Sequence, residues 1–157
     1  MMRREGGFTL IEMVVVLAIL AMLGAAARPL LELQVQRGKE RELREALRSV
    51  RASIDNYRQA ALTGQVARSP GDSGFPPNLE TLIKGVPDMR SATNQRIYFL
   101  RRMPRDPFAD PALPATETWA PRSADSPPDD PRPGRDVFDV ASTSQRKALD
   151  GSVYRDW

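Results

Sequence analysis

The stretch that decides the fold is GGFTLIEMVVVLAILAMLGAAARP, residues 6–29. Within it, residues 8–27 form a run of twenty in which only Thr9 and Glu12 are polar. As a helix that rises about 1.5 Å per residue, twenty apolar residues cross the hydrocarbon core of a bilayer. Two arginines precede the run, and basic residues on this flank favour a cytoplasmic N-terminus.

Glu12 is the unusual residue of this run. A carboxylate inside a membrane segment costs about 2.5–3.5 kcal/mol on insertion scales, so it predicts a functional site with a partner of opposite charge. Cleavage of the chain after Gly7 would give Phe8 a new α-amino group, which is mostly cationic at neutral pH. That cation would lie one helical turn from Glu12, at the edge of the apolar segment.

The segment Gly7-Phe8-Thr9-Leu10-Ile11-Glu12 resembles the class III signal of type IV pilins and pseudopilins. In that family a membrane aspartyl peptidase cuts after the glycine and N-methylates the new first residue. The family has a glutamate at mature position five and a proline at position twenty-two, which here are Glu12 and Pro29. The resemblance implies cleavage between Gly7 and Phe8, methylation of Phe8, and a role for Glu12 in assembly.

The N-terminus has two alternative interpretations. Arginines followed by an apolar run also describe a secretory signal, and Ala25-Ala26-Ala27 fits its small-residue cleavage site. A plain single-pass anchor is the other alternative. The run is long for a signal peptide, and neither alternative explains Gly7, Phe8 or Glu12.

The composition argues against several classes of function. The 157 residues include 23 basic and 20 acidic side chains, and they contain no His and no Cys. The sequence contains no basic stripe interleaved with aromatic residues, so nucleic-acid binding is not suggested. Histidine acid–base catalysis, cysteine nucleophiles and the usual zinc ligands are excluded, and no phosphate-binding or nucleophile-elbow motif occurs. We therefore expect a protein that is not an enzyme.

After the membrane segment, the sequence predicts a second, amphipathic half of the same helix. Its other faces carry charged residues, and Thr63-Gly64 provides a stop signal. Pro29 removes one helical hydrogen bond at a cost of about 3 kcal/mol and predicts a kink. The apolar stripe spans less than three heptads, so packing on the chain's own C-terminal domain is expected in preference to a coiled coil. The stripe consists of Leu43, Leu47, Val50, Ile54, Tyr57 and Ala61.

The remaining residues predict a small mixed domain. Residues 78–84 indicate a short helix capped by Asn78, with Leu79, Leu82 and Ile83 facing inward. Residues 116–120 and 136–142 indicate strands, and a last strand is expected after the turn at Asp150-Gly151. The expected fold is α+β, a long N-terminal helix packed on a small antiparallel sheet. Its expected segments are a leader (1–7), a membrane helix (8–28), an amphipathic helix half (29–64) and a globular domain (65–157).

Three segments of the C-terminal half resemble the major pseudopilin of type II secretion. Residues 98–108 are similar to its Y-I-x-x-L-P-x-D-P-W/F segment, residues 78–82 to its GLEAL helix, and residues 137–142 to its YDLLSAG strand. The resemblance implies a structural subunit of a periplasmic filament, anchored in the bacterial inner membrane with a cytoplasmic N-terminus. The implied partners are copies of itself, other pseudopilins, the inner-membrane secretion platform and the prepilin peptidase, with no nucleic acid.

One departure from that family concerns calcium. The major pseudopilin usually has an aspartate-rich calcium loop after this strand, whereas residues 143–150 offer one carboxylate and two cations. Because calcium takes six to eight oxygen ligands, Ser142 and Asp150 are weak candidates, and no cofactor is expected. A further acidic group, Asp125, Asp129 and Asp130, lies between prolines and is interpreted as a solvated loop.

Two alternative functions stay open. A type IV pilin or minor pilin would act in adhesion, motility or DNA uptake, and a C-terminal cysteine pair, absent here, would favour it. The other alternative is a membrane-anchored periplasmic binding module that never polymerises.

Overall fold

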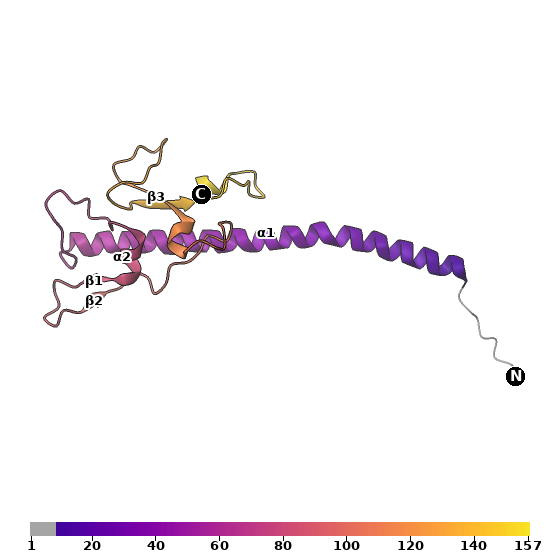
Figure 1. Cartoon of the computed structure of the whole chain (residues 1–157), viewed down its shortest axis with the longest axis horizontal. Coiled ribbons are helices and arrows are strands. Elements are labelled where there is room, and N and C mark those ends of the chain that lie inside the picture. The colour runs from indigo at the N-terminus through magenta and orange to yellow at the C-terminus, as the bar shows by residue number, and fades with distance from the viewer. Residues whose placement is uncertain (1–8) are drawn as a thin grey trace. The chain divides into compact units, whose positions relative to one another are not determined.

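The computed structural model describes residues 9–157, except for the side chains of residues 26 and 27. Its contacts divide the chain into two units, Met1–Gly38 and Lys39–Trp157, and each is described by itself. Helix α1, Leu10–Leu62, contributes to both (Figure 1). In the first unit, every large apolar side chain from Leu10 to Leu23 is exposed.

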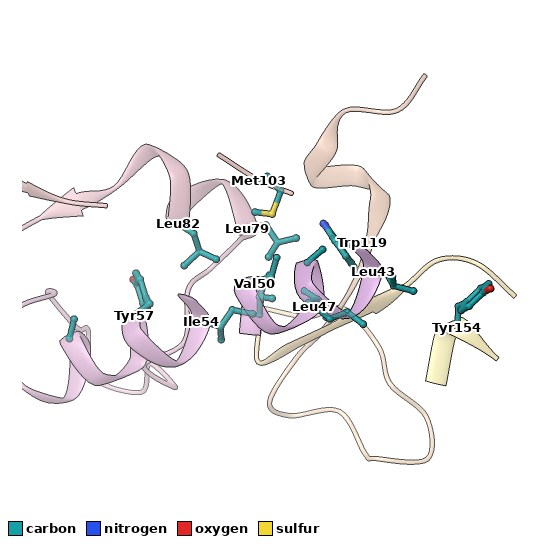
Figure 2. Packing of buried hydrophobic residues seen from close by; sticks show 14 of the residues in the cluster. Leu43, Leu47, Val50, Ile54, Tyr57, Leu79, Leu82, Met103, Trp119 and Tyr154 are labelled. Carbon is teal, nitrogen blue, oxygen red and sulfur yellow. The ribbon is translucent and has the colours of Figure 1, made fainter. Parts of the chain in front are cut away.

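The amphipathic half of α1 provides the spine of the second unit. All six residues of the predicted stripe are buried, from Leu43 at 0% exposure to Tyr57 at 7%. Figure 2 shows Leu43, Leu47, Val50 and Ile54 along the helix, with side chains of the C-terminal half packed around them. The prediction that this stripe packs on the chain's own domain is confirmed.

Helix α1 ends where the sequence predicts. The N–H of Gln65 donates to the carbonyl of Ala60 at 2.9 Å, and the N–H of Gly64 donates to that of Ala61 at 3.3 Å. This pair of bonds is a Schellman motif, which requires a left-handed residue after the helix. Gly64, with φ of 76°, supplies it.

Helix α2, Leu79–Lys84, confirms the second helical prediction. The Asn78 side chain accepts a hydrogen bond from the Thr81 N–H at 3.0 Å, as an N-cap residue does. Leu79 and Leu82 are buried, and Ile83 packs partly against the same core. Gly85 ends the helix with φ of 69°, and a Cβ there would lie 2.6 Å from the Ile97 carbonyl oxygen, so only glycine fits.

The strands form two separate two-stranded sheets. Strand β1, Val86–Pro87, pairs antiparallel with β2, Arg96–Ile97. Strand β3, Trp119–Arg122, pairs antiparallel with β4, Asp139–Ser142, so that Trp119 lies opposite Ser142. In Figure 1, β3 and the β1–β2 pair lie on opposite sides of α1. The α+β fold is confirmed, but the strands form two separate pairs where one sheet was expected, because α1 lies between the two pairs (Figure 1).

Three strand predictions need correction. Residues 115–118 form a 3₁₀ turn, η1 (Ala115–Thr118), in place of the start of a strand. The Thr118 hydroxyl donates to the Ala115 carbonyl at 2.7 Å and stabilises this turn, so the strand begins only at Trp119. Residues 136–138 precede β4 as a bend, because the N–H of Val137 donates to the Pro76 carbonyl at 2.8 Å.

The third correction concerns the C-terminal end. After the turn at Asp150-Gly151, one isolated bridge joins Lys147 and Val153. The chain then forms a second 3₁₀ turn, η2 (Tyr154–Asp156), in place of the expected strand. Tyr154 is completely buried, and its hydroxyl donates to the Glu40 carboxylate of α1, so the segment turns toward the helix at this point.

Arg51 of α1 binds both β4 and Trp157. Its Nε lies 2.7 Å from the Asp139 carboxylate of β4. Its Nη2 donates to the Val140 carbonyl at 3.0 Å and to the Trp157 carbonyl at 2.6 Å. One arginine of α1 therefore holds both β4 and the last residue of the chain.

Candidate functional site

Glu12 lies in the first turn of α1, where local sequence fixes the start of the helix. The N–H of Glu12 donates to the Thr9 hydroxyl at 3.3 Å, and the N–H of Met13 donates to the Thr9 carbonyl at 3.2 Å. Thr9 is therefore the N-cap, and Glu12 stands three residues after it, as in a capping box. An acidic side chain at this end of a helix also interacts favourably with the helix dipole.

Gly7 and Phe8 lie outside the described residues. The predicted cleavage between them and the methylation of Phe8 therefore stay predictions. The spacing of the Phe8 amine and the Glu12 carboxylate is likewise a prediction from the sequence. The described part of the site begins at Thr9.

An apolar helical surface surrounds Glu12. Helix α1 is long and apolar enough to cross a membrane, and none of its most apolar stretch is buried within the described part of the protein. Within residues 9–157, the Glu12 carboxylate forms no ion pair. An apolar face of this size requires lipid or other helices around it.

Pro29 lies inside α1, and the helix continues through it. Arg28, just before the proline, and Glu32, three residues after it, form an exposed i,i+4 ion pair at 3.7 Å. Such a pair stabilises a helix by about 0.2–0.5 kcal/mol, so it offsets only a small part of the cost of the proline. The kink at Pro29 stays a prediction.

The two weak calcium candidates, Ser142 and Asp150, bind different partners. The buried Ser142 hydroxyl donates to the Asp106 carboxylate at 2.5 Å. Asp150 accepts hydrogen bonds from the Ser152 hydroxyl at 2.6 Å and the Ser152 N–H at 2.9 Å, and these bonds lower the pKa of the Asp150 carboxyl. Among residues 9–157, no three His, Cys, Asp or Glu side chains form a group that could hold a metal ion. This donor set does not fit calcium, which takes six to eight oxygens.

The acidic loop pairs with its own arginines. Asp125 forms an ion pair with Arg135 at 2.9 Å, and Asp130 forms one with Arg132. All four side chains are largely exposed, so these pairs contribute little to stability. The loop is arranged as the solvated segment that the sequence indicates.

Sequence reasoning missed two residues. Thr9 as an N-cap follows from the pattern of Thr followed by Glu three residues later, which the sequence contains. Glu40, expected on a charged outer face of α1, is only 5% exposed and binds the C-terminal end of the chain. No local pattern could have indicated this, because its partners are more than 100 residues away.

Comparison with known proteins gives one match. Residues 2–27 match the family model described as the prokaryotic N-terminal methylation motif. No curated protein and no solved structure matches the chain. The N-terminal segment is therefore a prepilin-type methylation motif, as in type IV pilins and pseudopilins, and the match ends before the unit Lys39–Trp157.

Proposed function

We propose that this chain, which carries a prepilin-type methylation motif, is a pseudopilin, a structural subunit of a periplasmic filament in type II protein secretion. The prepilin peptidase removes residues 1–7 and methylates Phe8. Residues 8–28 anchor the protein in the inner membrane with the N-terminus in the cytoplasm, and residues 29–64 continue the helix. Residues 65–157 form the globular domain in the periplasm. The methylation motif over residues 2–27, with Glu12 inside its apolar run, is the observation that carries this proposal.

The exposed apolar half of α1 supports assembly. Within the described residues 9–157, its large apolar side chains from Leu10 to Leu23 are exposed, so lipid surrounds them in the monomer and neighbouring helices surround them in a filament. The Phe8 amine of one copy then meets the Glu12 carboxylate of the next. At about 4 Å and an effective dielectric constant near 20, this attraction is about 4 kcal/mol before the desolvation cost is subtracted. Such a pair sets the axial position of neighbouring helices.

The choice of type II secretion over a pilus depends on the C-terminal half. Residues 98–108 resemble the corresponding segment of the major pseudopilin, and they end in Asp106-Pro107-Phe108. Asp106 is 2% exposed, and its carboxylate accepts bonds from the Phe108 N–H at 2.7 Å and from Ser142. The motif therefore has a structural role in holding this turn to β4. A type IV pilin or minor pilin is the alternative function.

Processing is tested on protein extracted from membranes. N-terminal sequencing and intact mass should give a chain that begins at Phe8 with one added methyl group, and cells without prepilin peptidase should retain the leader. A mature N-terminus after Ala27 would show that the segment is a secretory signal. Deletion of the gene then separates the two systems. Loss of exported proteins supports the pseudopilin, whereas loss of surface pili with normal export supports the pilin alternative.

A further inference from the structure

We propose that the Glu40 carboxylate of α1, and not a metal ion, holds the C-terminal loop, residues 143–153, in its folded conformation. This is the loop in which the resemblance implies calcium. Its single carboxylate, Asp150, is already bound to Ser152 of the same loop. The inference is independent of the proposed filament function, because it concerns only contacts within Lys39–Trp157.

Glu40 reaches the loop and the residue that follows it. One carboxylate oxygen, Oε1, accepts hydrogen bonds from the Leu149 N–H at 2.9 Å and from the Tyr154 hydroxyl at 3.0 Å. Glu40 is 5% exposed and Tyr154 is completely buried. A buried carboxylate is costly unless donors surround it, and hydrogen bonds to a charged group are stronger than those between neutral groups. The contact between α1 and the loop is therefore a specific anchor.

Backbone bonds close the loop on itself. The Ala148 N–H donates to the Ser152 carbonyl at 2.8 Å, and the Tyr154 N–H donates to the Arg146 carbonyl at 3.1 Å. The indole N–H of Trp157 donates to the Ser152 hydroxyl at 2.7 Å. The loop is thus a closed turn whose ends meet, and Glu40 fixes that turn to the helix.

A row of aromatic rings flanked by cations lies beside this anchor. The Tyr154 ring stacks on Phe108 with centroids 4.0 Å apart, and the Trp157 ring meets Tyr154 edge-on at 5.1 Å. Arg146 lies 5.6 Å from the Phe108 ring, and Arg44 lies 4.1 Å from the Trp157 ring. Side chains of the protein therefore supply positive charge in this region, and they would repel a divalent cation.

The test measures how fast trypsin cuts the loop after Arg146 and Lys147, whose side chains are exposed. The full-length protein in detergent is digested with EDTA or with excess calcium chloride, and mass spectrometry identifies the cut. Cleavage requires local opening of the loop, so its rate reports how firmly the loop is anchored. The wild type should be cut at the same rate, within about twofold, in both conditions. Glu40→Gln should be cut about tenfold faster in both, because the charged acceptor is lost.

Two further variants sharpen the test. Tyr154→Phe keeps the ring stack but removes one donor to Glu40, so it should raise the cleavage rate by a smaller factor. Combined with Glu40→Gln it should add little, since both substitutions remove the same contact. Glu42→Gln, an exposed glutamate two residues away on α1, is the matched control and should leave the rate unchanged.

Two outcomes would overturn the proposal. The first is a wild-type loop that calcium protects, or EDTA exposes, by tenfold or more. The second is a Glu40→Gln rate equal to that of Glu42→Gln. A thermal melt followed by far-UV circular dichroism, which monitors helix α1, distinguishes loop opening from global unfolding, and if Glu40→Gln unfolds the domain, Tyr154→Phe decides the test. Filament formation is not a readout here, so failure of this inference and failure of the proposed function are separate results.

Discussion

Glu12 and Asp136 show how position decides what a carboxylate does. Glu12 is exposed on an apolar helix, and within residues 9–157 its carboxylate forms no ion pair. Asp136 is 4% exposed, and its Oδ1 accepts bonds from the Ser123 hydroxyl at 2.7 Å and the Ala124 N–H at 2.9 Å. The Glu12 carboxylate is therefore available to another molecule. The Asp136 carboxylate instead holds Ser123 and Ala124, which follow β3, to the segment that leads into β4.

Glu12→Ala should leave membrane insertion and cleavage after Gly7 intact but abolish filament assembly and export. The reason is that the Phe8 amine of the neighbouring copy loses its counter-charge. Glu12→Asp should do partial damage, because its side chain is shorter. Wild type and variants are compared for surface filaments on overexpression, for exported protein, and for processing by mass.

Glu45→Ala, at an exposed acid of the second half of α1, serves as the control and should behave as the wild type. Normal assembly and export by Glu12→Ala would refute the charge-pair model. Glu12 would then matter to the peptidase or to the start of the helix at Thr9.

Asp136→Asn should lower the free energy of unfolding by about 1–3 kcal/mol at pH 7, since the buried Ser123 hydroxyl and the partly buried Ala124 N–H lose a charged acceptor. Burial acts to raise the pKa of Asp136, but the nearby Ser73 hydroxyl, the bonds from Ala124 and Ser123 and the charge of Arg135 together lower it below its ordinary value of 3.8. The charged form therefore stabilises the fold above that ordinary value, and this contribution is lost as the pH falls through the lower folded value.

Urea unfolding of both proteins from pH 7 downward measures this difference. The difference in free energy of unfolding between wild type and Asp136→Asn should be constant above about pH 5 and should become smaller below about pH 4. Asp129→Asn, at an exposed position of the same loop, should show no gap at pH 7. A gap that persists unchanged to the lowest pH would mean that the charge of Asp136 does not contribute.

At the scale of elements, α1 was predictable because its signals are local. The spacing of Leu43, Leu47 and Val50 indicates one buried face, and Gly64 indicates the end. The Asn78-capped helix was predictable for the same reason. The bounds of the strands were less predictable. The 3₁₀ turn at Ala115–Thr118, which delays the start of β3, depends on one hydrogen bond from a side chain to the backbone. The Glu40 anchor was not predictable, since a charged residue on a helix gives no sign of distant donors.

Leu47→Asp or Ile54→Asp should unfold the second unit, because each places an unpaired charge among buried apolar side chains that are 3% and 1% exposed. Ala52→Asp, on the exposed side of the same helix, should cost less than about 1 kcal/mol, which is the lower helix propensity of Asp. Thermal melts followed by circular dichroism compare the three. Unchanged melting of both core variants would mean that the stripe faces another subunit.

At the scale of the whole molecule, Lys39–Trp157 has its own core and the N-terminal unit has exposed apolar side chains. A chain that begins at about Arg28 should therefore be a soluble monomer that unfolds cooperatively. Light scattering after size-exclusion chromatography measures its mass, and a thermal melt measures its cooperativity. Stable oligomers of this shortened chain would show that contacts outside the apolar segment are sufficient for association.

The bonds of Arg51 also have a mechanical consequence. Because Arg51 binds the Trp157 carbonyl and the Asp139 carboxylate together, a pull on the C-terminal end acts directly on the helix at one point. Force would load the Arg51 contacts before it could separate β4 from β3 one residue at a time. A protein fused after Trp157 would likewise emerge against the side of α1, so its linker must first clear the helix surface.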